Sequence, residues 1–303
     1  MKAWWTTPGQ ARWRAIALML CCAASVVTVQ AARERMAPMP EVSASPYIVR
    51  SAALIGRAAL SYRSLVADIY WVRTLQHYGQ TKLSKDPFKQ YSLLEPFLDL
   101  TTSLDPRFNA AYRFGAIFLA EPFPDGPGRP DQSVALLEKG LREQPEKWEF
   151  IYDIGFVEYW WRRNYEEAAR RFQQASRLPG APTWLAPLAA VTLAQGGDRR
   201  SSRQLWEQVR QAGEADWLVR AAEQRLRQLD ALDQIDRLET AVSAASLRLG
   251  RAPMGWREVV AAGVLRGMPL DPAGVPYRLR EDGEVVLDGR SPLNPLPVER
   301  ERR

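Results

Sequence analysis

Hydrophobic positions along most of the chain recur at the three- and four-residue spacing of amphipathic helices. From residue 47 to about residue 248, short polar or proline-bearing breaks separate these segments. In NYEEAARRFQQASRLPGAP, Ala168, Phe172 and Ala175 share one face of a helix, which Pro179 ends. The pattern therefore predicts a mainly α-helical body in which each helix buries one face against its neighbours.

A large aromatic residue follows several of these breaks, and its recurrence indicates a repeat. The aromatic positions are separated by 40, 36 and 33 residues and are Phe108, Trp148, Trp184 and Trp217. A period in the mid-thirties is typical of arrays of helical hairpins, and the longest interval contains the insertion EPFPDGPGRPD. The sequence therefore predicts successive helix pairs that stack on one another.

Small residues recur in the same frame. Gly115 and Gly155 each fall seven residues after the aromatic residue of their unit, where they let paired helices approach closely. These features resemble the tetratricopeptide repeat over residues 62–228, about four units, and the unit at 147–180 is the most similar. The resemblance implies a helical-hairpin solenoid whose first helices line a groove for a protein partner. The groove candidates that it implies are Asn109, Tyr112, Tyr152, Phe156 and Tyr159.

The N-terminal segment has a different pattern. Residues 15–32 carry no charge and would form a helix of roughly 27 Å, close to the hydrocarbon thickness of about 30 Å. We expect a transmembrane signal anchor at 15–32, preceded by a cytoplasmic region at 1–14 and followed by a linker at 33–46. The alternative is a secretory signal peptide that is cleaved near Ala31.

The repeats, predicted at 47–228, are followed by a long helical segment at 229–250. Its apolar residues recur every three positions, which gives a stripe that drifts around the helix rather than a heptad; they are Leu229, Leu232, Ile235 and Leu238. We favour a helix that caps the last repeat over a coiled-coil dimer.

Residues 251–290 form a small module with mixed character. The pattern predicts a short helix from Trp256 to Ala262 and a β-hairpin that turns at Glu281-Asp282-Gly283. Within 251–289, LDPAGVPYRL resembles the C-terminal end of the globular domain of major pseudopilins. The N-terminus lacks the prepilin glycine and acidic fifth residue, so the chain is not itself a pilin. Residues 291–303 are expected to be a flexible tail.

Charge changes this picture little. The chain has 41 basic and 35 acidic residues, a formal charge of +6. Setting aside Lys2, Arg12 and Arg14 before the apolar run, and the four arginines and two glutamates of residues 290–303, leaves 34 basic and 33 acidic residues. The body is nearly neutral, so we expect no nucleic-acid partner.

Residues that could bind a metal or act as catalysts are scarce. The two cysteines, Cys21 and Cys22, are adjacent within the apolar run, and His77 is the single histidine. On a helix, Asp68 would lie on the face opposite His77, so the two cannot form a base and its orienting partner. We therefore expect a structural or surface His77, no metal and no cofactor.

Other candidate chemistry is equally sparse. The sequence has no phosphate-binding glycine loop, no nucleophile elbow and no dinucleotide fingerprint. Three carboxylates at helical spacing, Asp230, Asp233 and Asp236, are expected to stay solvated on a helix surface. Eleven tryptophans are expected to act as wedges between stacked helices.

These expectations favour a non-enzymatic, membrane-anchored scaffold or adaptor that binds another protein in the cell envelope. Arginine supplies 35 of the 41 basic residues, a bias common in GC-rich bacteria, so we expect a single-pass protein of the bacterial inner membrane with a periplasmic body. One alternative is an accessory assembly factor for a pilus, secretion or transport system. A less favoured one is a glycan-cleaving enzyme that uses two carboxylates about 5–10 Å apart. The oligomeric state is not predicted.

Overall fold

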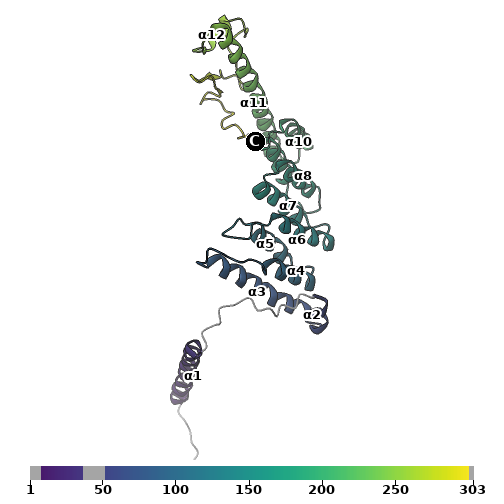
Figure 1. Cartoon of the computed structure of the whole chain (residues 1–303), viewed down its shortest axis with the longest axis vertical. Helices are drawn as coiled ribbons and strands as arrows, with labels where there is room; N and C mark the ends of the chain where they lie inside the picture. Colours follow the sequence, from purple (N-terminus) through teal and green to yellow (C-terminus); the bar gives the residue numbers. More distant parts are fainter. Residues whose placement is uncertain (1–7, 37–51, 300–303) are drawn as a thin grey trace, which may run out of the picture. The chain divides into compact units, whose positions relative to one another are not determined.

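The structure is a computed structural model that describes residues 8–36 and 52–299, and it is mainly helical (Figure 1). The chain divides into two units, Met1–Arg50 and Ser51–Arg303. The described part of the first unit is α1 (Pro8–Met36), which contains the predicted anchor segment. Among the described residues, no helix has both the length and the apolar composition that crossing a membrane requires.

Two predicted boundaries lie near α1. The helix begins at Pro8, a residue that suits the first helical position because its missing N–H has no helical partner there. It continues to Met36, so residues 33–36 of the linker expected at 33–46 are helical. Residues 1–7 of the expected cytoplasmic region and residues 37–51 lie outside the described residues.

The second unit consists of helices followed by one hairpin. Its elements are α2 (Ala52–Ala58), α3 (Arg63–Leu83), α4 (Leu94–Leu104), α5 (Asn109–Ala120), α6 (Pro130–Glu143), α7 (Trp148–Val157), η1 (Glu158–Arg162), α8 (Tyr165–Ser176), α9 (Leu185–Gln195), α10 (Arg199–Ala212), α11 (Asp216–Leu249), α12 (Trp256–Ala261), β1 (Arg278–Leu279) and β2 (Val285–Val286). The prediction of a mainly helical chain is confirmed.

Helices that are neighbours in the chain pack against each other. Helix α3 contacts α4, α5 contacts α6, α7 contacts α8 and α9 contacts α10. Each pair also contacts the next through α4 and α5, α6 and α7, or α8 and α9. Because each pair buries its apolar face largely on adjacent helices, the packing is local along the sequence.

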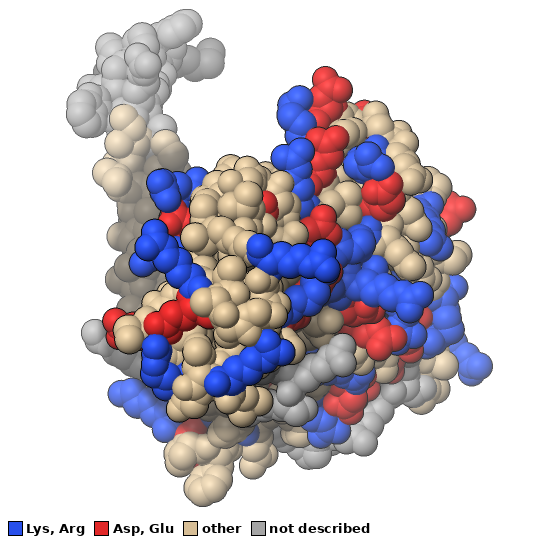
Figure 2. Space-filling model, turned by 90° about the horizontal axis from the view of Figure 1, so that it is seen from above, with Lys and Arg blue, Asp and Glu red and all other residues tan. Residues whose placement is uncertain are grey.

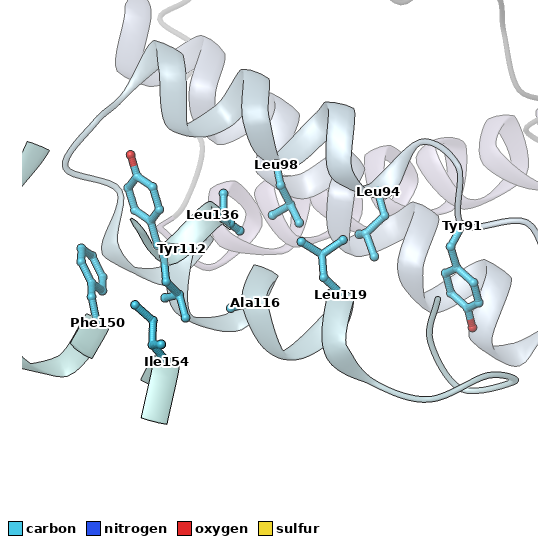
Figure 3. Close-up of a cluster of buried hydrophobic side chains, with 10 residues drawn as sticks. Tyr91, Leu94, Leu98, Tyr112, Ala116, Leu119, Leu136, Phe150 and Ile154 are labelled. Carbon is cyan, nitrogen blue, oxygen red and sulfur yellow. The ribbon is translucent and has the colours of Figure 1, made fainter. Parts of the chain in front are cut away.

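A buried cluster joins α4 to α7 (Figure 3). Leu98 of α4, Tyr112 of α5 and Phe150 of α7 point into it from three helices. The rings of Tyr112 and Phe150 are 5.3 Å apart, and the Tyr112 hydroxyl donates to the Thr102 carbonyl at 3.4 Å. Burial raises the pKa of Tyr112 to about 12, so the phenol stays protonated.

The two repeated glycines stand where helices approach closely. A Cβ atom on Gly115 would lie 2.4 Å from Leu98 Cδ2, and one on Gly155 would lie 2.6 Å from Phe172 Cε1. Both positions are buried within their helices. The close approach that the glycine spacing predicts is therefore present at both units.

Helix α11 is one unbroken helix of 34 residues, and its side chains contribute to two hydrophobic cores. Leu229 and Leu232 pack with residues of α9 and α10, including Ala190. Leu238 packs with residues of the C-terminal module, and Ile235 lies against the same cluster. The boundary predicted at residue 229 therefore falls inside a helix that already packs on α10.

The C-terminal module contains the predicted helix and hairpin. Strands β1 and β2 pair antiparallel, with Arg278 opposite Val286. Trp256 of α12 donates its indole N–H to the Tyr277 carbonyl at 2.7 Å, and the Tyr277 hydroxyl lies 2.9 Å from Gln234 Oε1 of α11. These contacts attach the hairpin and α12 to the long helix.

The expectation of a flexible tail at 291–303 is wrong for residues 291–299. The buried amide of Gln228 donates to the Leu293 and Pro295 carbonyls, each at 2.9 Å, and the Leu293 side chain is buried. Arg199 of α10 binds Glu299 through two hydrogen bonds. The tail is held because it satisfies a buried amide and adds to the core; residues 300–303 lie outside the described residues.

Candidate functional site

Four aromatic side chains form a ladder along α7 and η1. Trp148, Tyr152, Phe156 and Trp160 follow at four-residue intervals, so they occupy one helical face. Successive ring centroids are 6.4, 6.3 and 6.2 Å apart. Tyr152 and Phe156 are half-buried, whereas Trp160 is 55% exposed. We call these four residues the aromatic ladder.

A π-helical turn shapes the C-terminal end of the ladder. In η1 the backbone bonds span five residues, and such turns occur frequently at functional sites. The turn brings both adjacent tryptophans to Phe156, with ring centroids 6.2 Å away for Trp160 and 5.6 Å away for Trp161. Glu158, which is buried, accepts from Arg162 at 2.8 Å and so stabilises the turn.

The ladder extends sideways onto α8 and the segment before α9. The Tyr152 ring lies 5.6 Å from Phe172, a buried residue of α8, and 5.6 Å from Trp184. Trp184 is exposed, so Tyr152 connects the core to a second surface indole. Burial, with the nearby Asp153 carboxylate, raises the pKa of Tyr152, which keeps its hydroxyl neutral.

An ion pair joins helix α5 to α7 beside Tyr152. Arg113 of α5 binds Asp153 of α7 through two hydrogen bonds, Nε to Oδ2 at 2.5 Å and Nη2 to Oδ1 at 3.1 Å. Burial raises the pKa of Asp153, although the Arg113 guanidinium opposes that shift. Two large apolar side chains on α5, Phe114 and Ile117, are exposed. Helix α5 therefore presents exposed apolar side chains, together with an arginine whose charge is paired with Asp153 of α7.

The structure brings together only part of the predicted groove. Tyr152 and Phe156 belong to the ladder. Tyr159 is half-buried beside it, and its hydroxyl hydrogen-bonds Gln195 Oε1 at 2.8 Å. Asn109 lies at the start of α5, where its Oδ1 accepts from Gln144 at 2.9 Å. Both polar groups already have partners within the chain.

Tyr112 is not a groove residue, and that prediction is wrong. It occupies the same place in its unit as Tyr152, four residues after the aromatic marker. However, Tyr112 stands over Gly140 of α6, where a Cβ atom would lie 3.0 Å from its ring, and it is completely buried. The missing side chain at Gly140 makes room for the ring, so the residue contributes to the core.

Sequence reasoning did not single out the half-buried Trp161 or four exposed residues of α5, η1 and the segment before α9: Phe114, Ile117, Trp160 and Trp184. Trp160 carried a usable signal, because it continues the four-residue spacing from Tyr152 and Phe156. Trp161 carried none, since only the π-helical turn brings it to Phe156.

The described residues offer little metal or proton-transfer chemistry. No cluster of histidine, cysteine or carboxylate side chains within them could hold a metal ion. His77 packs edge-on against Phe97 at 6.0 Å, and its buried Nε2 has no hydrogen-bond partner. Burial lowers the pKa of His77, which favours the neutral ring in the packed helix pair.

The three aspartates of α11 are exposed on the helix surface, as expected, with 52%, 40% and 60% of the Asp230, Asp233 and Asp236 side chains accessible, but they also bind arginines. Arg199 binds Asp233 at 3.0 Å and Asp236 at 2.6 Å. Arg203 binds Asp230 and Asp233, each at 2.6 Å. The carboxylates thus join α11 to α10. On the face shown in Figure 2, basic and acidic side chains lie interspersed, with no continuous field of one sign.

A cavity of about 180 Å³ lies between α8, α9, α10 and the start of α11, with Arg177, Pro187 and Leu218 in its lining. Sites for drug-sized ligands enclose roughly 300–1,000 Å³, so this cavity is small for such a ligand. The aromatic ladder is an open, apolar surface, and such a surface suits a polypeptide better than a small molecule.

Comparisons with family models, with curated proteins and with solved structures find no match for the chain. The resemblances to tetratricopeptide repeats and to pseudopilins therefore stay predictions from the sequence. Function has to be argued from the surface that the helices present.

Proposed function

We propose that this protein is a membrane-anchored, non-enzymatic scaffold that binds a segment of another envelope protein along the aromatic ladder. The observation that carries the proposal is the row of rings that ends in the exposed Trp160, with the exposed Trp184 beside Tyr152. Aromatic residues are enriched at protein interfaces, and a contiguous exposed apolar patch is typical of a binding surface. The exposed rings of the ladder are thus the proposed contact.

The helical pairing supports a solenoid of the tetratricopeptide type. The ladder lies on α7, the first helix of the unit at 147–180, and the first helices of such repeats line the binding groove. Arg113 and Asp153 are 40 residues apart, at matching places in their units, and they link the first helices of adjacent units. In this proposal the pair positions α5 and α7 to share one ligand.

The chemistry of the surface favours an extended apolar segment. The ladder offers ring faces, and the nearby hydroxyl of Tyr159 and carboxylate of Asp153 already have partners within the chain. Proline-rich segments dock onto aromatic grooves because their extended conformation is already formed, which lowers the entropy lost on binding. A segment with prolines or other apolar residues is the ligand that we propose.

The apolar run supports the membrane anchor. Its large side chains are exposed around α1, which suits a lipid environment; they are Leu18, Met19, Leu20, Val26, Val27 and Val29. The hydroxyls of Ser25 and Thr28 donate to carbonyls one turn earlier, at 2.8 and 2.9 Å. Because these polar groups are satisfied inside the helix, they add little cost in hydrocarbon.

We place the anchor in the bacterial inner membrane, with the body in the periplasm; cleavage near Ala31 is the alternative. A reporter enzyme that works only outside the cytoplasm, fused after residue 60, is expected to be active. Cytoplasmic activity of a matched reporter would reverse this topology, and N-terminal sequencing of the mature chain separates anchor from cleaved peptide.

The accessory assembly factor is a second candidate. The hairpin and α12 form a compact module on α11, with Tyr277 and Trp256 in its core. This is the segment whose sequence resembles the end of a pseudopilin domain. A scaffold could use the repeats for one partner and the module for a component of a pilus, secretion or transport system.

Site-specific photo-crosslinking tests the proposed contact. The full chain is expressed in its own membrane with a photoreactive residue at Trp160, or at Gln224, an exposed position on α11 that serves as a control. We expect an envelope protein to be captured from position 160 and not from position 224. Equal capture at both positions would show that the ladder is not the binding surface.

A further inference from the structure

The first long helix of the second unit leaves an apolar stripe uncovered. Leu65, Ile69 and Val72 lie four and three residues apart on α3 and are 56%, 47% and 50% exposed. The opposite side of α3 packs on α4, with Ala67 and Thr74 completely buried. One side of α3 is therefore covered and the other is apolar and accessible.

This stripe is unusual for the end of a helical array. Terminal helices of such arrays normally have a polar outer face, because no further repeat covers them. At the other end, α11 carries the C-terminal module, and Ile235 and Leu238 pack beneath it. Within the described residues, the stripe of α3 thus has no covering element, whereas Ile235 and Leu238 of α11 are covered by the module.

The spacing of the stripe is that of a coiled-coil seam. With Leu65 and Val72 at position d of a heptad and Ile69 at position a, the seam continues to Gln76 at position a, and Tyr62, the residue before the helix, falls at the preceding a position. Both of these flanking residues are exposed. A polar residue at a single a position, as at Gln76, is known to set the register of such pairs.

Two charged residues border this seam on opposite sides. Asp68 takes position g, and Arg73 takes position e of the next heptad; both are exposed. Asp68 makes no ion pair within the part of the chain that the structure describes, and Arg73 lies over the Tyr70 ring at 5.6 Å. Both charges are therefore accessible to a second helix.

We propose that two copies of the chain pair through α3 as a parallel two-helix coiled coil. In a parallel pair, position g of one helix faces position e of the following heptad of the other. Asp68 of each copy then faces Arg73 of its partner, which forms two symmetric ion pairs across the seam. The charge pattern of α3 is thus complementary to itself.

Other occupants fit the same charges less well. In an antiparallel pair each flank meets its own copy, so Asp68 would lie along the flank that carries Asp68 of the partner, and Arg73 would lie along that of Arg73. Insertion of the stripe into lipid would carry Asp68 toward the hydrocarbon, which is costly for a carboxylate. A parallel second copy avoids both penalties.

The seam is short, so pairing in dilute solution is expected to be weak. Attachment of both chains to one membrane would raise their effective concentration, and both α3 helices would then point the same way. This gain in effective concentration rests on the proposed membrane anchor. The charge complementarity of Asp68 and Arg73 does not depend on it.

Charge reversal tests the pairing in the full chain, purified in detergent micelles. The molar mass of the protein is measured by light scattering over a concentration series for the wild type, Asp68→Arg, Arg73→Asp and the double variant. We expect the wild type to dimerise, each single variant to dimerise on the order of tenfold more weakly, and the double variant to recover. Because both positions are exposed, the fold should persist, which circular dichroism checks.

A monomeric wild type at every concentration would overturn the proposal. So would a dimer that the single reversals do not weaken, because its interface would lie elsewhere. If the double variant did not recover dimerisation, Asp68 and Arg73 would not pair across the seam, and the stripe of α3 would have a different partner. Arg73→Lys serves as a control, since it keeps the charge and should still dimerise.

Cysteine cross-linking tests the direction of the pair. Leu65→Cys is made in a chain with Cys21→Ser and Cys22→Ser, and a parallel seam is expected to give a disulfide-linked dimer at position 65. The absence of this product beside a dimer by mass would refute the parallel direction. Trp160→Ala should leave the molar mass of the dimer unchanged, because the ladder is not part of the seam. Loss of ligand binding at the ladder can therefore be distinguished from loss of pairing through α3.

Discussion

The replacement of Gly155 by alanine tests how closely α7 and α8 pack. The new methyl carbon would lie 2.6 Å from Phe172 Cε1, 2.8 Å from Cδ1 and 3.2 Å from the Ala168 carbonyl oxygen. Phe172 is buried, so its ring cannot swing into solvent. Overpacking of this kind costs about 1–3 kcal/mol, whereas alanine gains about 1 kcal/mol over glycine in a helix. We expect a net destabilisation of up to roughly 2 kcal/mol.

Gly79→Ala is a matched control. Gly79 lies within α3, and no atom outside its own helix lies within 4 Å of a Cβ atom placed there. The propensity gain is then unopposed, so this variant should stabilise the protein by up to about 1 kcal/mol. Urea unfolding followed by circular dichroism compares the two at a concentration where the protein is monomeric. A shift of both variants in the same direction would refute the close packing of α7 on α8.

A double variant adds a second check on the same contact. Phe172→Leu shortens the side chain that the new methyl group would meet, so Gly155→Ala should cost less in that background. The coupling between the two substitutions is expected to be about 0.5–3 kcal/mol. Strict additivity would mean that the methyl group does not meet Phe172.

Three further predictions concern the C-terminal tail, α10 and His77. Gln228→Ala leaves two tail carbonyls without their donor, so the free energy of unfolding should fall by about 1–3 kcal/mol, and limited proteolysis should cut after residue 290 sooner. Arg199→Ala should destabilise α10 against α11 at neutral pH. Burial alone would raise the pKa of Asp233, but the hydrogen bonds from Arg203 and Arg199 outweigh it, so the folded-state pKa is lowered overall. The stabilisation from these ion pairs is therefore present above the unfolded-state pKa and is lost as the pH falls through the lower folded-state pKa. His77 has a lowered pKa, so the unfolded chain binds its proton first and unfolding free energy should drop as the pH falls below 6.5; His77→Gln should remove that part of the pH dependence.

Sequence periodicity was enough to predict the helices and the glycine contacts, because both depend on local spacing. It could not separate Tyr112 from Tyr152, which hold the same place in two units. Their difference is set by the partner helix: Gly140 gives Tyr112 space in the core, whereas Tyr152 packs against Phe172 and Trp184. Whether a side chain at this place in a unit is exposed therefore depends on the helix that packs against it, and not only on its position within the repeat.

The tail was mispredicted for a related reason. Prolines and charges near the C-terminus are typical of a loose end, and nothing nearby in sequence indicates a partner. The partners are Gln228, 65 residues before Leu293, and Arg199, 100 residues before Glu299. A buried amide in a long helix is a usable signal, because Gln228 must find acceptors somewhere in the fold.

The drifting stripe of α11 explains how one helix joins the repeats to the module. A step of three residues turns the side chain by about −60°, so the nine residues from Leu229 to Leu238 turn it by about 180°. The two leucines therefore face opposite sides of the helix, separated by roughly 14 Å along its axis. Leu229 packs with α9 and α10, and Leu238 packs in the module.

This geometry fixes the module relative to the last repeat. A heptad would have kept all four apolar residues on one side, and only one of the two cores could then have used them. The helix continues without a break between the cores, and Arg199 binds both α11 and the tail, so these contacts oppose rotation of the module relative to α10. A partner that contacts the repeats and the module would meet two surfaces held at a constant spacing, which suits the proposed scaffold.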